Sequence, residues 1–284
     1  MIAVNIQPYI ALMRLNRPIG IYLLLWPTLI ALWLASNGPP TLRLLIIFSC
    51  GVIIMRSCGC VINDYADRNF DAQVTRTKNR PLANNQITTS QALALFLILL
   101  IMAFILALQL DPRVIVLSTV AASLAVLYPF SKRFTNYPQI ILGLAFAWSI
   151  PMVYMQIQKI VPLEAWLIFA STMCWVIAYD TIYAMADKAD DLKVGIKSTA
   201  IAFGKFDKII IFMLHCVSIL GFAYIGYTRQ FGFVYYFGLV CALIMAVYQQ
   251  GLIRRRDPNQ CFRAFLNNNY FGALIFLGTV GSFY

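Results

Sequence analysis

Seven of the eleven acidic residues in this chain lie in two short segments, each at the end of a long apolar run. The first segment reads Asn63-Asp64-Tyr65-Ala66-Asp67-Arg68-Asn69-Phe70-Asp71, and the second extends from Asp180 to Asp191. At about 100° per residue, the three acids of the first segment would share one narrow helix face, as would those at positions 180, 187 and 191. Like charges crowded on one face repel one another, so the pattern indicates that a cation binds there.

The chemistry of these side chains favours a magnesium-bound diphosphate. All-oxygen ligands suit Mg²⁺ better than zinc, and Mg²⁺ commonly takes one or two carboxylates and completes its octahedron with water and substrate phosphate. Basic residues follow both acidic segments, Arg76, Lys78 and Arg80 after the first and Lys193 and Lys197 after the second. A metal together with such cations neutralises the charge of a leaving diphosphate. The connections at about 63–90 and 187–207 are therefore predicted to form two matching half-sites of one cavity, within a single domain spanning 1–284.

The elements that position these segments are predicted to be transmembrane helices. The chain is 61% hydrophobic and only 12% charged, whereas soluble domains carry about 25% charged residues. The apolar runs are continuous and lack the alternation of a transmembrane barrel, so an all-α polytopic membrane protein is expected. The expected spans are about 18–36, 42–62, 91–110, 113–130, 138–157, 163–186, 208–227, 231–250 and 265–284.

The net charge of +11 is explained by topology and not by nucleic-acid binding. Nine spans place the two chain ends on opposite sides of the bilayer. All but four of the 22 Lys and Arg residues then fall on the side of the N-terminus, the exceptions being Arg43, Arg113, Lys159 and Arg229. This asymmetry predicts that the N-terminus and both acidic segments are cytoplasmic.

These motifs resemble those of the UbiA superfamily of intramembrane aromatic prenyltransferases. The first segment is similar to its Asn-Asp-x-x-Asp-x-x-x-Asp motif, and Asp187 to Asp191 is similar to its Asp-x-x-x-Asp motif. Four further segments are similar to the branch that prenylates 4-hydroxybenzoate. They are Arg14–Gly20 with Trp26-Pro27, Arg76–Leu82, Tyr128–Arg133 and Asp190–Thr199.

The resemblance implies about nine transmembrane helices around a central cavity open to the cytoplasm and, laterally, to lipid, in a bacterial inner membrane. It also implies Mg²⁺-dependent transfer of a polyprenyl group from polyprenyl diphosphate to 4-hydroxybenzoate, ortho to the hydroxyl, in ubiquinone biosynthesis. One Mg²⁺ half-site would comprise Asn63, Asp64, Asp67 and Asp71, and the other Asp187 and Asp191. The candidates for diphosphate contacts are Arg80, Lys132, Arg133, Lys193 and Lys197.

Several roles stay open at this level. The acceptor carboxylate needs a cation, for which Arg14, Arg17 and Arg56 are candidates. Tyr128, Tyr179 and Tyr183 would either stabilise an allylic cation through their ring faces or anchor the helices at the membrane interface. Lys132 and Lys197 would either bind diphosphate or only set topology.

Three other functions compete with this interpretation. The acceptor of a related enzyme would be dihydroxynaphthoate, homogentisate or haem. A phosphatidyltransferase of the CDP-alcohol type would show one acidic motif interleaved with Gly and Arg, whereas two separate motifs occur here. An ion-coupled transporter would carry its acids near the middle of broken spans, whereas most of these acids fall at helix ends.

Overall fold

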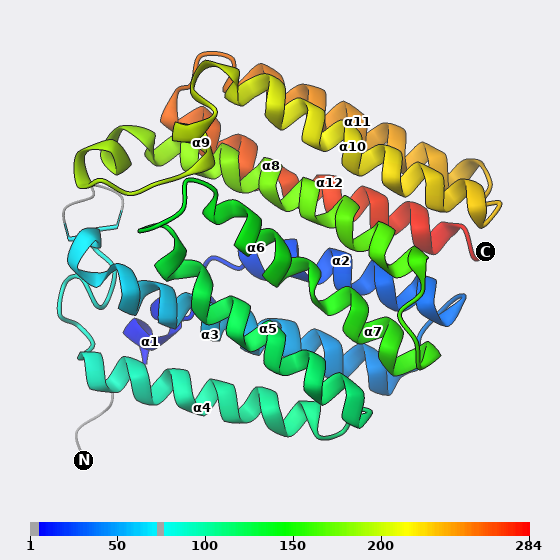
Figure 1. Ribbon diagram of the computed structural model, residues 1–284, viewed down its shortest axis with the longest axis horizontal. Helices are drawn as coiled ribbons and strands as arrows, with labels where there is room; N and C mark the ends of the chain where they lie inside the picture. Colours follow the sequence, from blue (N-terminus) through cyan, green and yellow to red (C-terminus); the bar gives the residue numbers. More distant parts are fainter. Residues whose placement is uncertain (1–5, 73–76) are drawn as a thin grey trace.

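The computed structural model describes residues 6–72 and 77–284, and within these residues the secondary structure is entirely helical. Long helices run side by side, alternating in direction (Figure 1). The helices are α1 (Gln7–Leu12), α2 (Ile19–Ser36), α3 (Leu42–Asp71), α4 (Thr89–Ala107), α5 (Pro112–Ser131), α6 (Pro138–Ala147), α7 (Ser149–Gln158), α8 (Leu163–Val194), α9 (Thr199–Ala202), the 3₁₀ turn η1 (Gly204–Phe206), α10 (Asp207–Thr228), α11 (Phe233–Ile253) and α12 (Pro258–Gly281).

Each of the nine predicted spans coincides with one long helix or, for 138–157, with the pair α6 and α7. Eight of these elements within the described residues are long and apolar enough to cross a membrane, which confirms a multi-pass membrane protein. The ninth, α12, is more polar because it carries Asn267, Asn268 and Asn269. Two of them are satisfied by indole N–H groups, since Trp175 donates to Asn268 at 3.0 Å and Trp26 donates to Asn269 at 2.8 Å. Inside a bundle such partners reduce the cost of a polar helix.

The two ends of the bundle differ as the sequence predicted. Helix α1 and the long connections after α3 and α8 lie at one end, and the C-terminus lies at the other (Figure 1). Of the four basic residues assigned to that opposite end, Arg43 and Arg113 lie in the first turns of α3 and α5. Lys159 and Arg229 follow the last residues of α7 and α10.

Helices α3 and α8 are much longer than the spans predicted from hydropathy. They contain 30 and 32 residues, whereas about 20 suffice to cross a bilayer. The additional turns carry the acidic segments, so these segments are helical and do not begin the loops as the ranges 63–90 and 187–207 indicated. Helix α8 ends where Gly195 adopts a φ of 73°, a left-handed conformation that glycine accommodates readily.

The span predicted at 138–157 is interrupted at Trp148, between α6 and α7. Pro151 explains the interruption, because its nitrogen cannot donate to the carbonyl of Ala147 four residues earlier. The Trp148 indole donates to the Leu117 carbonyl of α5 at 2.9 Å and so ties the break to its neighbour.

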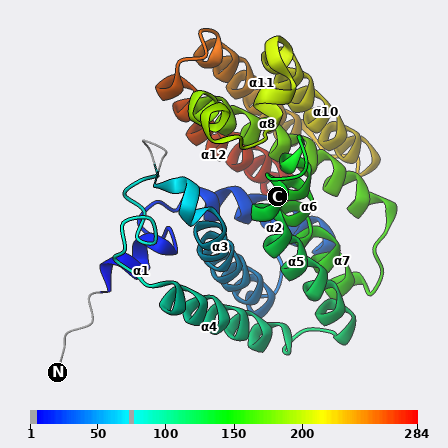
Figure 2. The ribbon, with the colours of Figure 1, turned by 60° about the vertical axis from the view of Figure 1, so that its left-hand side comes forward.

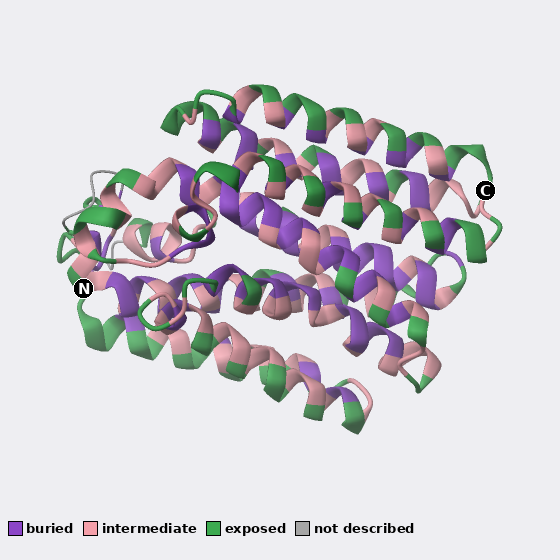
Figure 3. Cartoon of the chain, turned by 45° about the horizontal axis from the view of Figure 1, so that its top comes forward, coloured by how far each residue is buried: buried purple, intermediate pink, exposed green. Residues whose placement is uncertain are grey.

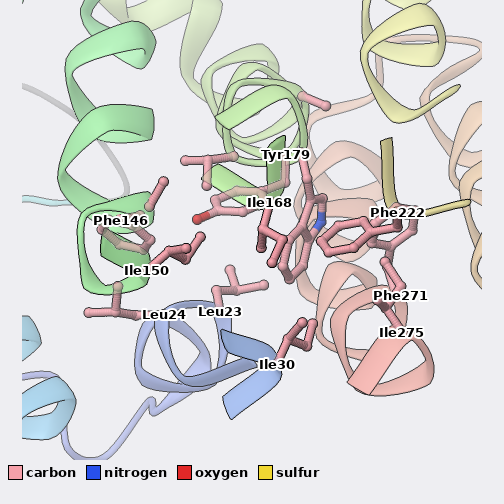
Figure 4. Packing of buried hydrophobic residues seen from close by; sticks show 14 of the residues in the cluster. Leu23, Leu24, Ile30, Phe146, Ile150, Ile168, Tyr179, Phe222, Phe271 and Ile275 are labelled. Atoms are coloured by element: carbon pink, nitrogen blue, oxygen red, sulfur yellow. The ribbon is translucent and has the colours of Figure 1, made fainter. Parts of the chain in front are cut away.

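The principal core lies where α2, α6, α7, α8, α10 and α12 meet. Leu23, Ile150, Tyr179, Phe222 and Phe271 are among the side chains that pack there (Figure 4). Buried positions concentrate on these central helices (Figure 3). Helix α4 lies at the edge of the bundle, beside α3, with most of its surface accessible (Figure 2).

Candidate active site

A cavity of about 1030 Å³ lies between α2, α3, α4, α5, the α6–α7 pair, α8 and α12. On α3 its lining extends from Ile47 to Asp64, about 25 Å along the helix. Most of its wall is apolar, whereas its polar side chains gather toward the end of α3 that carries the first acidic segment. This arrangement confirms a central cavity among the helices.

The carboxylates of the first acidic segment point inward from α3. Asp64, Asp67 and Asp71 are only 1%, 6% and 6% exposed, so the predicted common face is a buried face. Buried carboxylates need cationic or hydrogen-bonding partners. Three different segments supply those partners here: the loop after α1, the loop after α3 and the end of α5.

Arg14 and Arg80 hold two of these carboxylates. Arg14 Nη2 lies 2.8 Å from both oxygens of Asp64. Arg80 Nη1 lies 2.7 Å from Asp71 and 3.2 Å from Asp64. Burial opposes the charge of Arg80, but Asp64 and Asp71 outweigh it and raise the pKa of its guanidinium above the ordinary value. Arg76, which belongs to the same sequence motif, lies outside the described residues.

Lys132, at the end of α5, connects the first acidic segment with the loop that follows α8. Its Nζ lies 3.0 Å from Asp67 Oδ2 and 3.4 Å from Asn63 Oδ1. Its backbone carbonyl accepts from the N–H of Lys197, in the connection after α8, at 3.2 Å. One residue thus contacts the first acidic segment through its side chain and the second connection through its backbone.

Asp187 and Asp191 lie in the last turns of α8, at the same end of the bundle as the end of α3 (Figures 1 and 2). Both are half-buried, and neither is among the described residues that line the cavity. Lys193 is exposed and pairs with Asp190 at 2.9 Å. Asp187 and Asp191 therefore stand at the polar end of the bundle, outside the cavity wall to which Asn63 and Asp64 contribute.

Arg133 is directed against α3 and not into the cavity. Its Nη2 donates to the Ala66 carbonyl at 2.6 Å, and its guanidinium lies 5.6 Å and 5.5 Å from the rings of Phe70 and Phe130. In this arrangement Arg133 fixes the end of α5 onto the helix that carries the first motif.

The middle of the cavity contains polar groups that lack hydrogen-bond partners within the described part of the chain. Arg56 lines the cavity with a buried Nε for which the described residues provide no acceptor, and the Tyr179 hydroxyl is also buried without a partner. Arg56 lies directly against Gly20 of α2, where an added Cβ would come 2.2 Å from its Nε. The structure therefore separates three arginines that the sequence could not rank: Arg14 is paired, Arg17 is exposed, and Arg56 is half-buried with an Nε that has no acceptor among the described residues.

Asp180 is a cavity residue that was not among the predicted site residues. It is 8% exposed, and the Tyr128 hydroxyl donates to its Oδ2 at 3.5 Å. Tyr179 and Tyr183 of the same helix also line the cavity. The signal was present in the sequence, because Asp180 lies two helical turns before Asp187 on the same face.

The oxygen donors of the first segment fit a magnesium ion. Asn63, Asp64, Asp67 and Asp71 offer only amide and carboxylate oxygens, which are hard ligands that Mg²⁺ prefers. Among the described residues no three His, Cys, Asp or Glu side chains are clustered as a ready-made metal cage. Mg²⁺ does not need such a cage, since it retains several waters and substrate oxygens.

The model of the UbiA prenyltransferase family matches residues 24–275. The chain belongs to the UbiA prenyltransferase family. Two relatives, both named 4-hydroxybenzoate octaprenyltransferase, come from Pseudoalteromonas translucida and Hahella chejuensis. The first is 50% identical over 279 residues, covering 98% of this chain and 96% of the relative. The second is 53% identical over 275 residues, covering 97% and 92%.

Solved structures agree on the fold of this UbiA family member. A UbiA homolog from Aeropyrum pernix superimposes with a TM-score of 0.81 at 22% identity, covering 92% of this chain and 97% of the homolog. A UbiA homolog from Archaeoglobus fulgidus, bound to GPP and Mg²⁺, gives a TM-score of 0.73 at 17% identity and covers 95% and 99%. Membership in this family decides against the transporter and CDP-alcohol phosphatidyltransferase interpretations.

Proposed function

We propose that this protein transfers a polyprenyl group from polyprenyl diphosphate to the ring carbon of 4-hydroxybenzoate ortho to the hydroxyl, with Mg²⁺, as a step of ubiquinone biosynthesis. The observation that carries the proposal is the distribution of charge in one cavity. Its polar end contains the Asp64 carboxylate paired with Arg14 and Arg80, its middle holds Arg56 with a buried Nε that has no acceptor among the described residues, and most of the remaining wall is apolar. A diphosphate, a carboxylated ring and a prenyl chain need these three environments, with the ring beside the carbon that the diphosphate leaves.

The diphosphate would bind at the end of α3. Asn63, Asp64, Asp67 and Asp71 would hold Mg²⁺ from one side, and Asp187 and Asp191 from the other. Bound Mg²⁺ supplies neutralisation of the charge that builds on the departing diphosphate. Arg14, Arg80 and Lys132, which now pair with the acids, would turn to phosphate oxygens and keep that charge compensated.

The acceptor would bind in the middle of the cavity. Arg56 is the favoured partner of its carboxylate, because a guanidinium whose Nε is buried without an acceptor among the described residues gains most from a new anionic acceptor. The Tyr179 hydroxyl, also unpaired, is a second donor nearby on α8. This places the ring between the diphosphate end and Arg56.

The reaction needs a shielded cation and a base. Ionisation of the allylic C–O bond leaves a carbocation, and the faces of Tyr128 and Tyr183 would stabilise it. The ring attacks this cation and forms the new C–C bond. The ring proton at that carbon then passes to the Asp180 carboxylate, and its bonding electrons restore aromaticity. The apolar wall excludes water, which would otherwise yield a prenyl alcohol.

The decisive experiment combines purified protein, 4-hydroxybenzoate, a mixture of prenyl diphosphates and either Mg²⁺ or EDTA, with products identified by mass spectrometry. We expect prenylated 4-hydroxybenzoate only with Mg²⁺, with the octaprenyl donor among those used. Asp67→Asn and Asp187→Asn should lose at least about two orders of magnitude in rate, as expected for ligands of a metal that would stabilise the leaving diphosphate. Asp190→Asn is the matched control, because it removes from the same segment of α8 a half-buried carboxylate that pairs with the exposed Lys193. Rates near wild type for both site variants would remove the metal assignment.

The same experiment ranks other acceptors. Dihydroxynaphthoate and homogentisate, offered at equal concentration, should be prenylated much more slowly than 4-hydroxybenzoate if the acceptor assignment is right. Preference for either of them would keep the prenyltransferase chemistry and replace the acceptor.

The proposal also includes an orientation in the bacterial inner membrane. The excess of Lys and Arg at the end that carries α1 and the acidic segments supports a cytoplasmic position for that end. Alkaline phosphatase fused after Tyr284 should then be active, and green fluorescent protein fused at the same position should be dark. The reverse pattern would overturn the orientation.

A further inference from the structure

A second hollow, of about 510 Å³, lies between the beginning of α10 and the end of α11. Its lining shares no residue with the central cavity. Lys205, Lys208 and Arg254 bring positive charge to it, Gln250 contributes an amide, and the rest of its lining is apolar. The beginning of α10 and the end of α11 lie at the same end of the bundle as the ends of α3 and α8 (Figure 1).

The polar groups of this hollow are hydrogen-bond donors that lack anionic acceptors. Lys208 Nζ donates to the backbone carbonyl of Arg254 at 3.2 Å, and Lys205 Nζ lies 5.2 Å from the ring centroid of Phe206. Within residues 6–72 and 77–284 no carboxylate pairs with these two lysines or with Arg254. The Gln250 Nε2 is buried and has no acceptor among the same residues. A buried amide donor without a partner costs free energy that a bound anion would recover.

The nearest acid in the sequence is already engaged elsewhere. Asp207 is fully buried, with its carboxylate 2.7 Å from Arg256 Nη2 and 3.9 Å from Lys188 Nζ. Those hydrogen bonds from Arg256 raise the pKa of its guanidinium, as expected for a stable pair. Among the residues that the structure describes, no carboxylate therefore pairs with the positive charge of the hollow.

We propose that this hollow binds the headgroup phosphate of an anionic phospholipid. Basic pockets between transmembrane helices near a membrane surface attract anionic lipids, with roughly a fivefold gain in affinity for each Lys or Arg. Ile209 and Val247, at the rim, are 58% and 54% exposed. Farther along the same outward surface, Met213 and Ile244 are 59% and 55% exposed. This apolar surface accommodates acyl chains, so a phospholipid gains contacts that free phosphate lacks.

The test measures lipid binding by the full-length protein, delipidated in a neutral detergent. Bound phosphatidylglycerol is counted by native mass spectrometry, and the thermal midpoint is titrated with phosphatidylglycerol, phosphatidylcholine or inorganic phosphate. We expect phosphatidylglycerol to bind and to raise the midpoint, whereas the other two have little effect. In the triple variant Lys205→Gln/Lys208→Gln/Arg254→Gln, apparent affinity for phosphatidylglycerol should fall at least tenfold.

The matched control is Lys78→Gln/Arg255→Gln/Arg263→Gln, which removes the same charge from exposed positions at the same end of the bundle and should keep most of the affinity. If both triple variants lose affinity equally, or if inorganic phosphate reproduces the effect of the lipid, the proposal is overturned. Gln250→Glu provides an independent test should the triple variant aggregate. It places a carboxylate of nearly the same shape in the hollow and should also repel the headgroup, so unchanged binding by this variant would equally overturn the site.

Discussion

Replacement of Gly20 by alanine should selectively impair binding of the carboxylated acceptor. A Cβ at this position would lie 2.2 Å from Arg56 Nε, 2.5 Å from Nη2 and 2.7 Å from Cζ. The neighbour is the far end of a flexible side chain and not backbone, so the guanidinium would move while the helices stay in place. Gly20 lies in the first turn of α2 and does not have a positive φ, so its backbone conformation is compatible with alanine. The fold should therefore survive, while Arg56 leaves the position assigned to it in acceptor binding.

The magnitude follows from the interaction that is lost. A hydrogen bond to a charged group is worth about 1.5–3 kcal/mol, which corresponds to roughly a 10- to 150-fold change in an equilibrium constant. We expect the KM for 4-hydroxybenzoate to rise by a factor in this range. The KM for the prenyl diphosphate should stay within about twofold, because the displaced Arg56 lies eight residues before Asp64 on α3, about 12 Å along the helix.

The assay is steady-state prenyl transfer with two acceptors, 4-hydroxybenzoate and its uncharged amide. The Gly20→Ala variant should lose affinity for the acid and change little toward the amide, and Gly20→Ala should add nothing once Arg56 is replaced by methionine. Gly251→Ala serves as the control, because an added Cβ there meets nothing within 4 Å. Equal losses for the acid and the amide, or an unchanged KM for the acid, would refute the role of Arg56.

Four further results are expected. Asp180→Asn should slow C–C coupling while release of diphosphate continues. With ring-deuterated 4-hydroxybenzoate, this variant should show a primary isotope effect. A reduced rate without an isotope effect would exclude Asp180 as the base. Glu164→Gln should lower the thermal midpoint of unfolding, because Arg229, now 2.6 Å from Glu164, would keep a half-buried charge without its partner. Glu164→Gln combined with Arg229→Met should recover part of the lost stability. Asn268→Ala should cost about 1–3 kcal/mol, since the Trp175 N–H would lose its acceptor; an unchanged midpoint would indicate that water replaces it. Calorimetry should show Mg²⁺ and pyrophosphate binding more tightly together than separately, and independent binding would contradict charge exchange at the site.

The long helices were predictable because hydropathy reports burial in lipid directly. Positions 42–62 and 163–186 were assigned as spans on that basis, and α3 and α8 include both. Hydropathy could not show that these helices continue to Asp71 and Val194, since polar residues end an apolar run without ending a helix. The interruption at Trp148 was missed for the opposite reason, because a proline within an apolar run hardly changes mean hydropathy although it removes a backbone donor.

The site was predictable in its acids but not in their partners. The spacing of Asp64, Asp67 and Asp71 determines their common face once α3 is helical. The sequence could not show that Arg14, 50 positions away from Asp64, reaches it. Nor could it distinguish Lys132, which contacts Asp67, from Arg133, which turns to the Ala66 carbonyl. These distinctions depend on how separate helices are rotated against one another, and that rotation is set by packing.

The pairing of charges at the polar end bears on how the substrate enters. Three buried carboxylates face three cations, Arg14, Arg80 and Lys132, so the site is locally balanced as it stands. Mg²⁺ arriving alone would displace those cations and leave them near another positive charge. Diphosphate arriving alone would take the cations and leave the carboxylates unpaired in a buried position, which is costly. When Mg²⁺ and diphosphate arrive together, the carboxylates bind the metal in place of Arg14, Arg80 and Lys132. These three cations then bind phosphate oxygens in place of the carboxylates. No buried charge is then left without a partner, and this balance favours entry of the diphosphate as its magnesium complex.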